Sequence, residues 1–340
     1  MVDTSLAAPV GPASLRSLLW GSASAAREST VDLVVVQDDS ASMCRADDAG
    51  PGVARLEAVR LAVSLLGPGA RVGFVAFGAA RRGQMIPLRR VRDAEDRRGL
   101  MAGIVAATYE KGGTDYGDGL RSAIDALMTG DVAYGWRPYC VPGRTAGVLL
   151  VSDGRLSDPN QLRELRERNG VYDCLRQRGV PVFTIGVGSA AHEPEAAAVL
   201  REMAVATGGR PFLAPTPGAL LGACTEVVAQ LSGRDWTADR PEQAPMVRFF
   251  DLGPGLREAT FVAVKSAEDM VLRIVDADGK EVRCVARTSE GRFEHVTVAD
   301  PGAGSWSAMI TGAGEASVGL LTSVAHGLPA GRGGLDPGAG

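Results

Sequence analysis

Carboxyl and hydroxyl side chains alternate directly after one apolar segment of the chain, in the run Asp38-Asp39-Ser40-Ala41-Ser42. Carboxylate, hydroxyl and water oxygens are the ligands that hard divalent cations prefer in proteins. The D-x-S-x-S spacing of Asp38, Ser40 and Ser42 therefore indicates a metal site. Because the hydroxyls are neutral, a cation that they held would keep much of its charge and would attract a carboxylate from a partner.

Two other segments carry the same kinds of side chain. The run SDG at 152–154 follows an apolar strand, and the glycine-rich run GGTD at 112–115 leads into a predicted helix. In open α/β sheets, ligands bind in the crevice outside the carboxyl ends of the strands, where such segments meet. We therefore predict one metal site that takes Mg²⁺ first, with Mn²⁺ and Ca²⁺ as alternatives. Its residues are Asp38, Ser40, Ser42, Thr114 and Asp153.

The elements around these residues alternate between strand and helix. Val31–Gln37 (VDLVVVQ) is rich in β-branched residues, which indicates a strand buried on both faces. The whole pattern predicts a doubly wound α/β fold, in which helices flank a mostly parallel sheet. Further strands are predicted at Arg71–Gly78, Gly147–Ser152, Val182–Val187 and Phe212–Ala214, with an edge strand at Met85–Leu88. Helices are predicted at Ala54–Leu66, Gly99–Ala107, Gly117–Met128, Pro159–Arg168, Glu195–Ala206 and Pro217–Leu231.

After about Trp236 the pattern changes to short strands separated by turn signals, which is typical of a small antiparallel β-sandwich. The run DADGK at Asp276–Lys280 is the clearest hairpin turn, and Trp306 is expected to anchor the core. The predicted strands are Phe261–Val264, Met270–Val275, Val282–Ala286, Phe293–Val298 and Trp306–Ile310. We thus expect an N-terminal arm at 1–30, an α/β domain at 31–233, a β-sandwich at 242–327 and a flexible tail at 328–340.

Five motifs occur in order along residues 31–233: VDLVVVQDDSASM, RVGFVAFG, GGTDYGDGL, GVLLVSDG and VFTIGVG. In these motifs the chain resembles the von Willebrand factor A (vWA) domain family. The resemblance implies a metal-ion-dependent adhesion site (MIDAS), with the family's ligand positions on the five residues named above. Ala41 stands where the family commonly has glycine. In some members the helix at the end of the domain moves with affinity, and Pro217–Leu231 would be that helix here.

The sequence at Gly302–Gly312 (GAGSWSAMITG) is similar to the small β-sandwich that follows the A domain in hemicentins and calcium-activated chloride channel regulators. The family resemblance implies a non-enzymatic module whose metal binds an Asp or Glu of a protein partner. The first alternative is an intracellular adaptor of an AAA+ ATPase, of the MoxR or chelatase type. The second alternative is an enzyme, for which we find no catalytic residue. A haloacid dehalogenase-type phosphatase needs an aspartate where Ser40 stands.

Composition excludes several other classes of protein. Of 340 residues, 45% are apolar and 22% charged, and the net charge of −4 argues against a nucleic-acid partner. No apolar run is long enough for a membrane span, and oligomeric state is not indicated. The absence of a signal-peptide pattern and the odd number of cysteines favour the cytoplasm. Asp39, Asp115 and Asp118 are expected to be solvated loop acids, and the arginine-rich stretch 81–98 a solvated edge.

Overall fold

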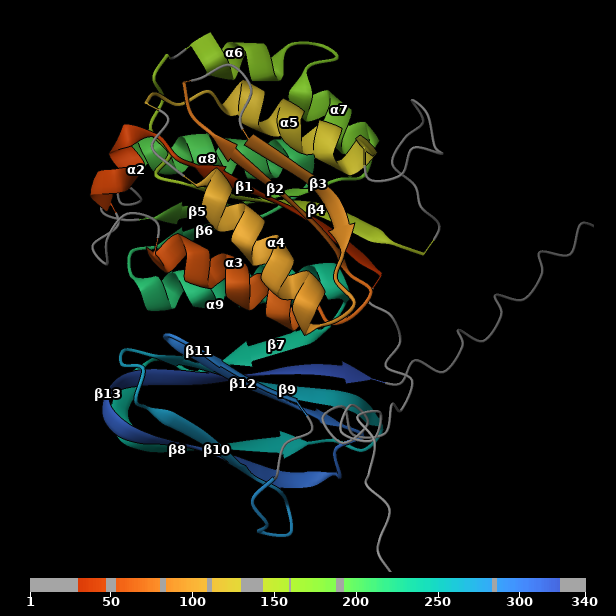
Figure 1. Cartoon of the computed structure of the whole chain (residues 1–340), viewed down its shortest axis with the longest axis vertical. Coiled ribbons are helices and arrows are strands. Elements are labelled where there is room, and N and C mark those ends of the chain that lie inside the picture. The colour runs from red at the N-terminus through yellow and green to blue at the C-terminus, as the bar shows by residue number, and fades with distance from the viewer. Residues whose placement is uncertain are drawn as a thin grey trace, which may run out of the picture.

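The computed structural model describes residues 30–46, 53–79, 84–108, 112–129, 143–158, 160–187, 193–282 and 286–324. The predicted arm and tail therefore lie outside the described residues. In Figure 1, a sheet with helices on both faces lies above a layered all-β domain. No helix in the described ranges is long and apolar enough to cross a membrane.

The upper sheet, sheet A, has six strands in the order β3-β2-β1-β4-β5-β6, which is the predicted doubly wound arrangement. Neighbouring strands pair in parallel except β3, which runs antiparallel at one edge. Every residue of the central strand β1 is buried, because helices cover both of its faces. The strands are β1 (Val31–Asp38), β2 (Arg71–Phe77), β3 (Gln84–Arg90), β4 (Thr145–Ser152), β5 (Val182–Val187) and β6 (Pro211–Ala214).

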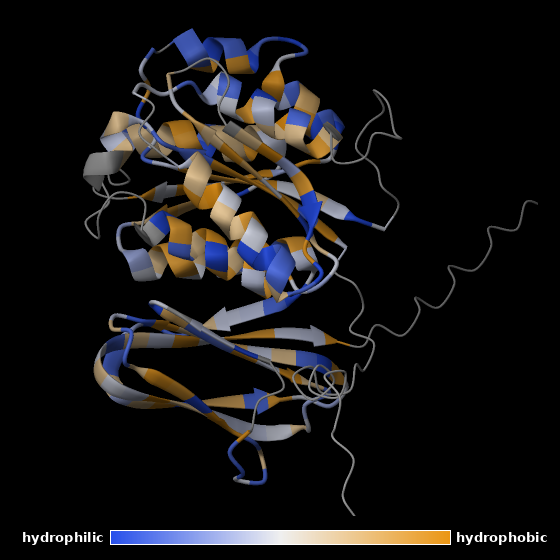
Figure 2. Cartoon of the chain, in the orientation of Figure 1, coloured by the Kyte–Doolittle hydropathy of each residue, from blue (hydrophilic) through white to orange (hydrophobic). Residues whose placement is uncertain are grey.

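Alternate residues of β1 point into two separate apolar cores. Leu33 and Val35 pack with α3, α4 and α9, whereas Val34 and Val36 pack with the helices on the other face, α5 to α8. Figure 2 shows the hydrophobic colouring concentrated on the strands and on the helix sides that face them. The helices are α2 (Ala41–Ala46), α3 (Val53–Leu65), α4 (Ala94–Ala107), α5 (Tyr116–Thr129), α6 (Asn160–Arg166), α7 (Val171–Gln177), α8 (Pro194–Thr207) and α9 (Pro217–Ser232).

Three of these helices differ from the prediction, and the first of them, α2, is not predicted at all. Helix α4 begins at Ala94 rather than at Gly99, because the Asp93 side chain accepts from the backbone N–H groups of Glu95 and Asp96 and so caps the helix. The sequence pattern predicts no helix at Val171–Gln177, where the structure has α7. That helix is short and begins after Gly170, which supplies no side-chain cap.

The second domain, called the β-domain below, is confirmed as antiparallel, but β9, β12 and β13 are longer than predicted, and the sequence pattern predicts neither β7 nor β8. The last strand pairs with β8 and β10 through its first half, bends near Gly312 and Gly314, and pairs with β9 and β7 through its second half. The domain therefore folds over one apolar core. Its strands are β7 (Asp235–Ala238), β8 (Glu242–Leu252), β9 (Leu256–Lys265), β10 (Val271–Val275), β11 (Ala286–Glu290), β12 (Phe293–Ala299) and β13 (Gly304–Val324).

Two details of the β-domain bear on the prediction. Trp306 lies in its core, stacks on Phe261 with ring centroids 6.0 Å apart and donates from its indole nitrogen to the carbonyl of Gly302. This is the anchoring role expected of it. The strand predicted at Val282–Ala286 lies partly outside the described residues, and the structure places β11 from Ala286 onward. The sheet also includes β7, which precedes the predicted domain start at 242.

One face of the β-domain packs directly against α3 and α9 (Figure 1). Val262 of β9 and Phe293 of β12 belong to the same apolar cluster as α3, α9 and β1. Polar contacts join the same surfaces. Arg292 donates to a carboxylate oxygen of Glu57 at 2.9 Å, and His295 Nε2 lies 3.1 Å from Ser64 Oγ. The two domains therefore share a continuous core rather than a solvated linker.

Candidate metal centre

The structure brings the predicted site residues to one edge of sheet A. Asp38 is the last residue of β1, and Asp153 directly follows the neighbouring strand β4. Ser40 and Ser42 lie at the start of α2, with their hydroxyl oxygens 3.1 Å apart. The backbone N–H of Ala41 donates to the carbonyl of Gly112 at 2.7 Å, which ties this loop to the one that carries Thr114. Asp38, Ser40, Thr114 and Asp153 are buried, and Ser42 is partly exposed.

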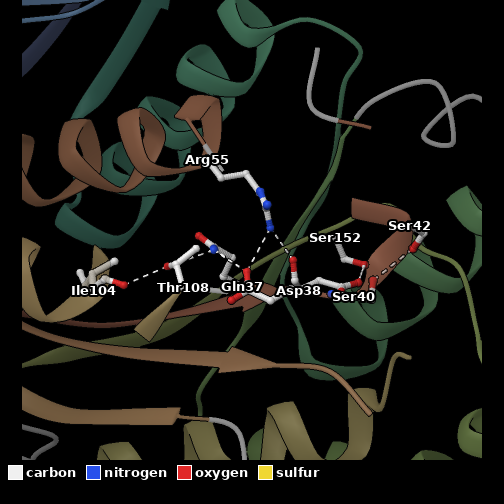
Figure 3. Close-up of polar contacts among 9 residues, drawn as sticks. Gln37, Asp38, Ser40, Ser42, Arg55, Ile104, Thr108 and Ser152 are labelled. Carbon is white, nitrogen blue, oxygen red and sulfur yellow. Dashed lines mark hydrogen bonds and ion pairs between the residues drawn. The ribbon is translucent and has the colours of Figure 1, made fainter. Parts of the chain in front are cut away.

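Both carboxylate oxygens of Asp38 accept hydrogen bonds. Oδ1 accepts from the Ser40 backbone N–H at 2.9 Å, and Oδ2 accepts from the Ser152 hydroxyl at 2.6 Å (Figure 3). Burial raises the pKa of Asp38 to about 6, against the lowering effect of these two hydrogen bonds, and the charge of Asp153 adds to the rise. Within the part of the chain that the structure describes, the Asp38 carboxylate is thus buried and accepts from no positively charged side chain.

Asp153 is only half satisfied. Its Oδ1 accepts from the backbone N–H of Arg155 at 3.1 Å, whereas its buried Oδ2 has no hydrogen-bond partner. A buried carboxylate oxygen without a partner costs free energy, so such an atom points to a missing ion or water. This unpartnered oxygen lies at the same sheet edge as the hydroxyls of Ser40 and Ser42, a donor set that suits a hard divalent cation.

Two hydroxyl groups in series, those of Tyr116 and Ser152, support the Asp38 carboxylate. The Tyr116 hydroxyl lies 2.6 Å from Ser152 Oγ, and burial together with the charge of Asp38 raises the pKa of Tyr116 well above 10. Because Ser152 gives its proton to Asp38, Tyr116 must donate to Ser152. Sequence reasoning missed Ser152, although a hydroxyl beside Asp153 at the last position of a buried strand was a signal for it.

The backbone around Thr114 is held by the loop and helix that follow β4. The Thr114 N–H donates to Ser157 Oγ at 2.7 Å, and the side-chain amide of Gln161 donates to the Thr114 carbonyl at 2.6 Å. These contacts span 43 and 47 positions of sequence. No local pattern in the sequence marks Ser157 or Gln161 for this function.

The expectation for Asp39 is wrong. Asp39 is 2% exposed, and its Oδ1 accepts from Gln37 Nε2 at 2.7 Å and from Arg55 Nη1 at 3.1 Å. The same Arg55 nitrogen donates to the carbonyl of Asp38 at 2.6 Å (Figure 3). Asp39 is therefore in a buried ion pair with Arg55 and lies within residues 38–43, which we call the metal loop because they carry three of the candidate ligands. Asp115 accepts from the N–H of Asp118 at the start of α5.

The candidate centre depends on hydroxyls more than on acids. Over the described ranges, no group of three or more His, Cys, Asp or Glu side chains is placed to hold a metal ion. Of the histidines, His295 lies at the interface with the β-domain, and His192 and His326 lie outside the described residues. Cys174 and Cys224 are free thiols, and Cys224 is buried in α9.

The model of the von Willebrand factor type A domain matches residues 32–220, which is more than half of the chain. The chain therefore belongs to the vWA domain family. The match covers β1 through the first turn of α9 and includes all five candidate metal residues. A search of curated proteins finds no match to the sequence.

Several solved structures are similar to the chain at low sequence identity. A von Willebrand factor type A protein from Catenulispora acidiphila has 17% identity and a TM-score of 0.47, with 88% of this chain and 59% of that chain covered. The pilus adhesin SpaC from Lactobacillus rhamnosus GG has 12% identity and a TM-score of 0.47, covering 88% and 39%. The PilB minor pilin from Streptococcus sanguinis has 14% identity and a TM-score of 0.41, covering 60% and 62%. The chain spans less than two thirds of the length of each of these proteins.

Proposed function

We propose that this vWA protein binds a protein partner through a divalent cation held in a MIDAS, without chemical turnover. The observation that carries the proposal is the buried, unpartnered Oδ2 of Asp153 at the same edge of sheet A as the hydroxyls of Ser40 and Ser42. Membership of the vWA family supports a protein-interaction module in general. The five residues fit the cation on chemical grounds, since all of their donor atoms are oxygens.

The residues divide into two roles in this proposal. Ser40, Ser42 and Thr114 would offer neutral hydroxyl oxygens directly to the cation. Asp38 has both oxygens engaged in hydrogen bonds, so it would hold the Ser40 backbone and the Ser152 hydroxyl in place. When bound, Mg²⁺, or Mn²⁺ or Ca²⁺ in its place, supplies a positive charge with room for a further oxygen ligand.

The same charge balance defines the partner. Few carboxylates would neutralise the cation directly, so an Asp or Glu side chain of the partner is the complementary ligand. We also propose that the β-domain corresponds to the small sandwich of hemicentins and of calcium-activated chloride channel regulators. In that arrangement it would hold the vWA domain in a fixed orientation.

Isothermal titration with Mg²⁺ and Mn²⁺ tests the metal site. Asp153→Asn keeps the shape of the side chain but removes its charge, and we expect it to weaken cation binding by about 10–100-fold. The matched control is Asp251→Asn, because Asp251 is exposed on β8, in the other domain. Absence of cation binding by the unmodified protein would contradict the proposal, as would equal binding by the Asp153→Asn variant.

The partner is tested by affinity capture with and without EDTA. We expect capture that is lost with EDTA and lost in the Asp153→Asn variant, and restored by Mg²⁺ only in the unmodified protein. Capture that is insensitive to both changes would contradict a metal-bridged contact. An AAA+ ATPase among the metal-dependent partners would identify the adaptor function, which uses the same site.

A further inference from the structure

Helix α3 contacts both the metal loop and the β-domain, and these contacts lie on different sides of the helix. Arg55 lies in its first turn and is 4% exposed. Glu57 and Ser64, further along, face the β-domain. A helix of 13 residues is about 20 Å long and moves as one body, so a change at one of these surfaces is felt at the other.

At the metal loop, Arg55 holds two consecutive residues of the D-x-S-x-S run. Its Nη1 donates to the carbonyl of Asp38 at 2.6 Å and to Oδ1 of Asp39 at 3.1 Å. In Figure 3 the Arg55 side chain reaches from α3 to Asp38 at the end of β1, from which the chain continues to Ser40 and Ser42. Hydrogen bonds to nitrogen donors need about 2.7–3.2 Å, so a shift of α3 by ~1 Å would break them.

On its other side, α3 contacts the β-domain through the β11–β12 turn and through β12. Arg292 donates from Nε to Oε2 of Glu57 at 2.9 Å. The turn approaches so closely that a side chain on Gly291 would come within 2.5 Å of the Glu57 carboxylate. Near the other end of the helix, Ser64 donates to the Leu61 carbonyl and lies 3.1 Å from His295 Nε2, which therefore donates to it.

We propose that Arg55 is a positioning residue for the metal loop, and that docking of the β-domain on α3 sets where Arg55 sits. The β-domain then tunes the affinity of the site through α3. The cation-dependent part of this inference rests on the proposed function, but the coupling itself concerns loop order and can be measured without metal.

The test is amide hydrogen exchange of residues 38–43 in the full-length, metal-free protein. Arg292→Gln removes the ion pair to Glu57 and should accelerate exchange in this loop about five- to tenfold, with β5 unchanged. Ser64→Ala is a milder second variant at the same helix and should act in the same direction. Arg248→Gln is the matched control, because Arg248 pairs with Asp239 and Glu242 within the β-domain and should leave the loop unchanged.

The involvement of Arg55 is tested by a double-mutant cycle. Arg55→Met should accelerate loop exchange, Arg55→Lys should restore part of the protection, and adding Arg292→Gln to Arg55→Met should cause no further change. Unchanged loop exchange in both Arg292→Gln and Ser64→Ala, or additive effects of Arg55→Met and Arg292→Gln, would overturn the proposal. A Mn²⁺ titration of the unmodified protein is run in parallel. Its failure would contradict the proposed metal site while the exchange result still decides the coupling.

Discussion

Strand β1 carries a buried aspartate near each end, and the two have opposite surroundings. At the amino end, Asp32 accepts from Nε and Nη2 of Arg71 at 2.7 and 2.6 Å, and from Nε and Nη2 of Arg144 at 2.9 and 2.7 Å. At the carboxyl end, the Asp38 carboxylate accepts from a backbone N–H and a hydroxyl. Both side chains are 0% exposed.

The negative charge of Asp32 is neutralised by arginine side chains, whereas the carboxylate of Asp38 accepts only from neutral groups among the described residues. Two guanidinium groups compensate Asp32, and Arg144 also donates to the carbonyls of Val31 and Gly69, so this cluster fastens three segments together. Among the described residues, no arginine or lysine donates to the Asp38 carboxylate, and burial raises the pKa of Asp38 to about 6. A cation held beside it would supply the missing charge.

The largest expected loss of stability comes from a change at Asp32, at the amino end of β1. Asp32→Asn leaves two arginines at a buried site without their carboxylate, and we expect a loss of about 3–5 kcal/mol in the free energy of unfolding, measured in urea. Cation affinity of the folded fraction should stay the same. Asp38→Asn serves as the control, since removal of an uncompensated charge should cost far less at pH 7. Equal losses in the two variants would show that the surroundings of Asp32 and Asp38 do not differ in the way described.

The next prediction concerns the pH dependence of stability, to which Asp38 and His295 contribute in opposite directions. Asp38 has a folded pKa of about 6 against an ordinary 3.8, so its contribution is full below pH 3.8 and is lost as pH rises through 6. Burial lowers the pKa of His295 to about 4 from 6.5, and the charges of Arg97 and Arg234 add to this. Its contribution is full above pH 6.5 and is lost as pH falls through 4. Each amounts to about 3 kcal/mol, with opposite sign.

Replacing one of the two residues at a time should reveal the contribution of the other to the pH dependence of stability. In metal-free protein, Asp38→Asn should make stability rise with pH between 4 and 6.5 more steeply than in the unmodified chain. His295→Gln should make stability fall with pH relative to the same reference. Urea unfolding at several pH values measures both slopes. If the two variants shifted the slope in the same direction, the assigned environments would be wrong.

The smallest expected effect concerns the hydroxyl group that supports Asp38 at the carboxyl end of β1. Ser152→Ala removes the hydroxyl that links Tyr116 to Asp38. We expect a loss of about 2 kcal/mol in stability, since hydrogen bonds to charged groups lie in this range, together with weaker Mn²⁺ binding by titration calorimetry. Asp32→Asn should change stability alone. A Ser152→Ala variant with unchanged Mn²⁺ affinity would show that the Asp38 support is not needed for the site.

The α/β fold could be predicted because its signals are local. The run Val31–Gln37 is mostly apolar where the strand is covered on both faces, and Ser40, Ser42 and Asp153 come directly after strand ends. The predicted start of α4 is too late. Gly99 marks the expected beginning, but it lies inside the helix, and the cap at Asp93 sets the true beginning. The length of β13 was missed because its glycines resemble turns, although two of them form the bend between layers.

The supporting residues of the site could not be predicted because they act across the sequence. Arg55 reaches Asp38 over 17 positions, and Gln161 reaches Thr114 over 47. Asp39 looks like a loop acid until Arg55 is seen beside it. Sequence patterns report which residue types follow a strand, but not which loops fold back over them.

The pairing of β7 with the end of β13 has a consequence for synthesis of the chain. Thr237 pairs with Leu320, so the first strand of the β-domain finds its partner only near the end of the described chain. Helix α3 leaves the ribosome long before β9 and β12, which cover part of the apolar surface that it shares with α9. Because the β-domain completes its sheet only with β13, we expect the nascent vWA domain to keep this apolar surface uncovered until translation passes about residue 324.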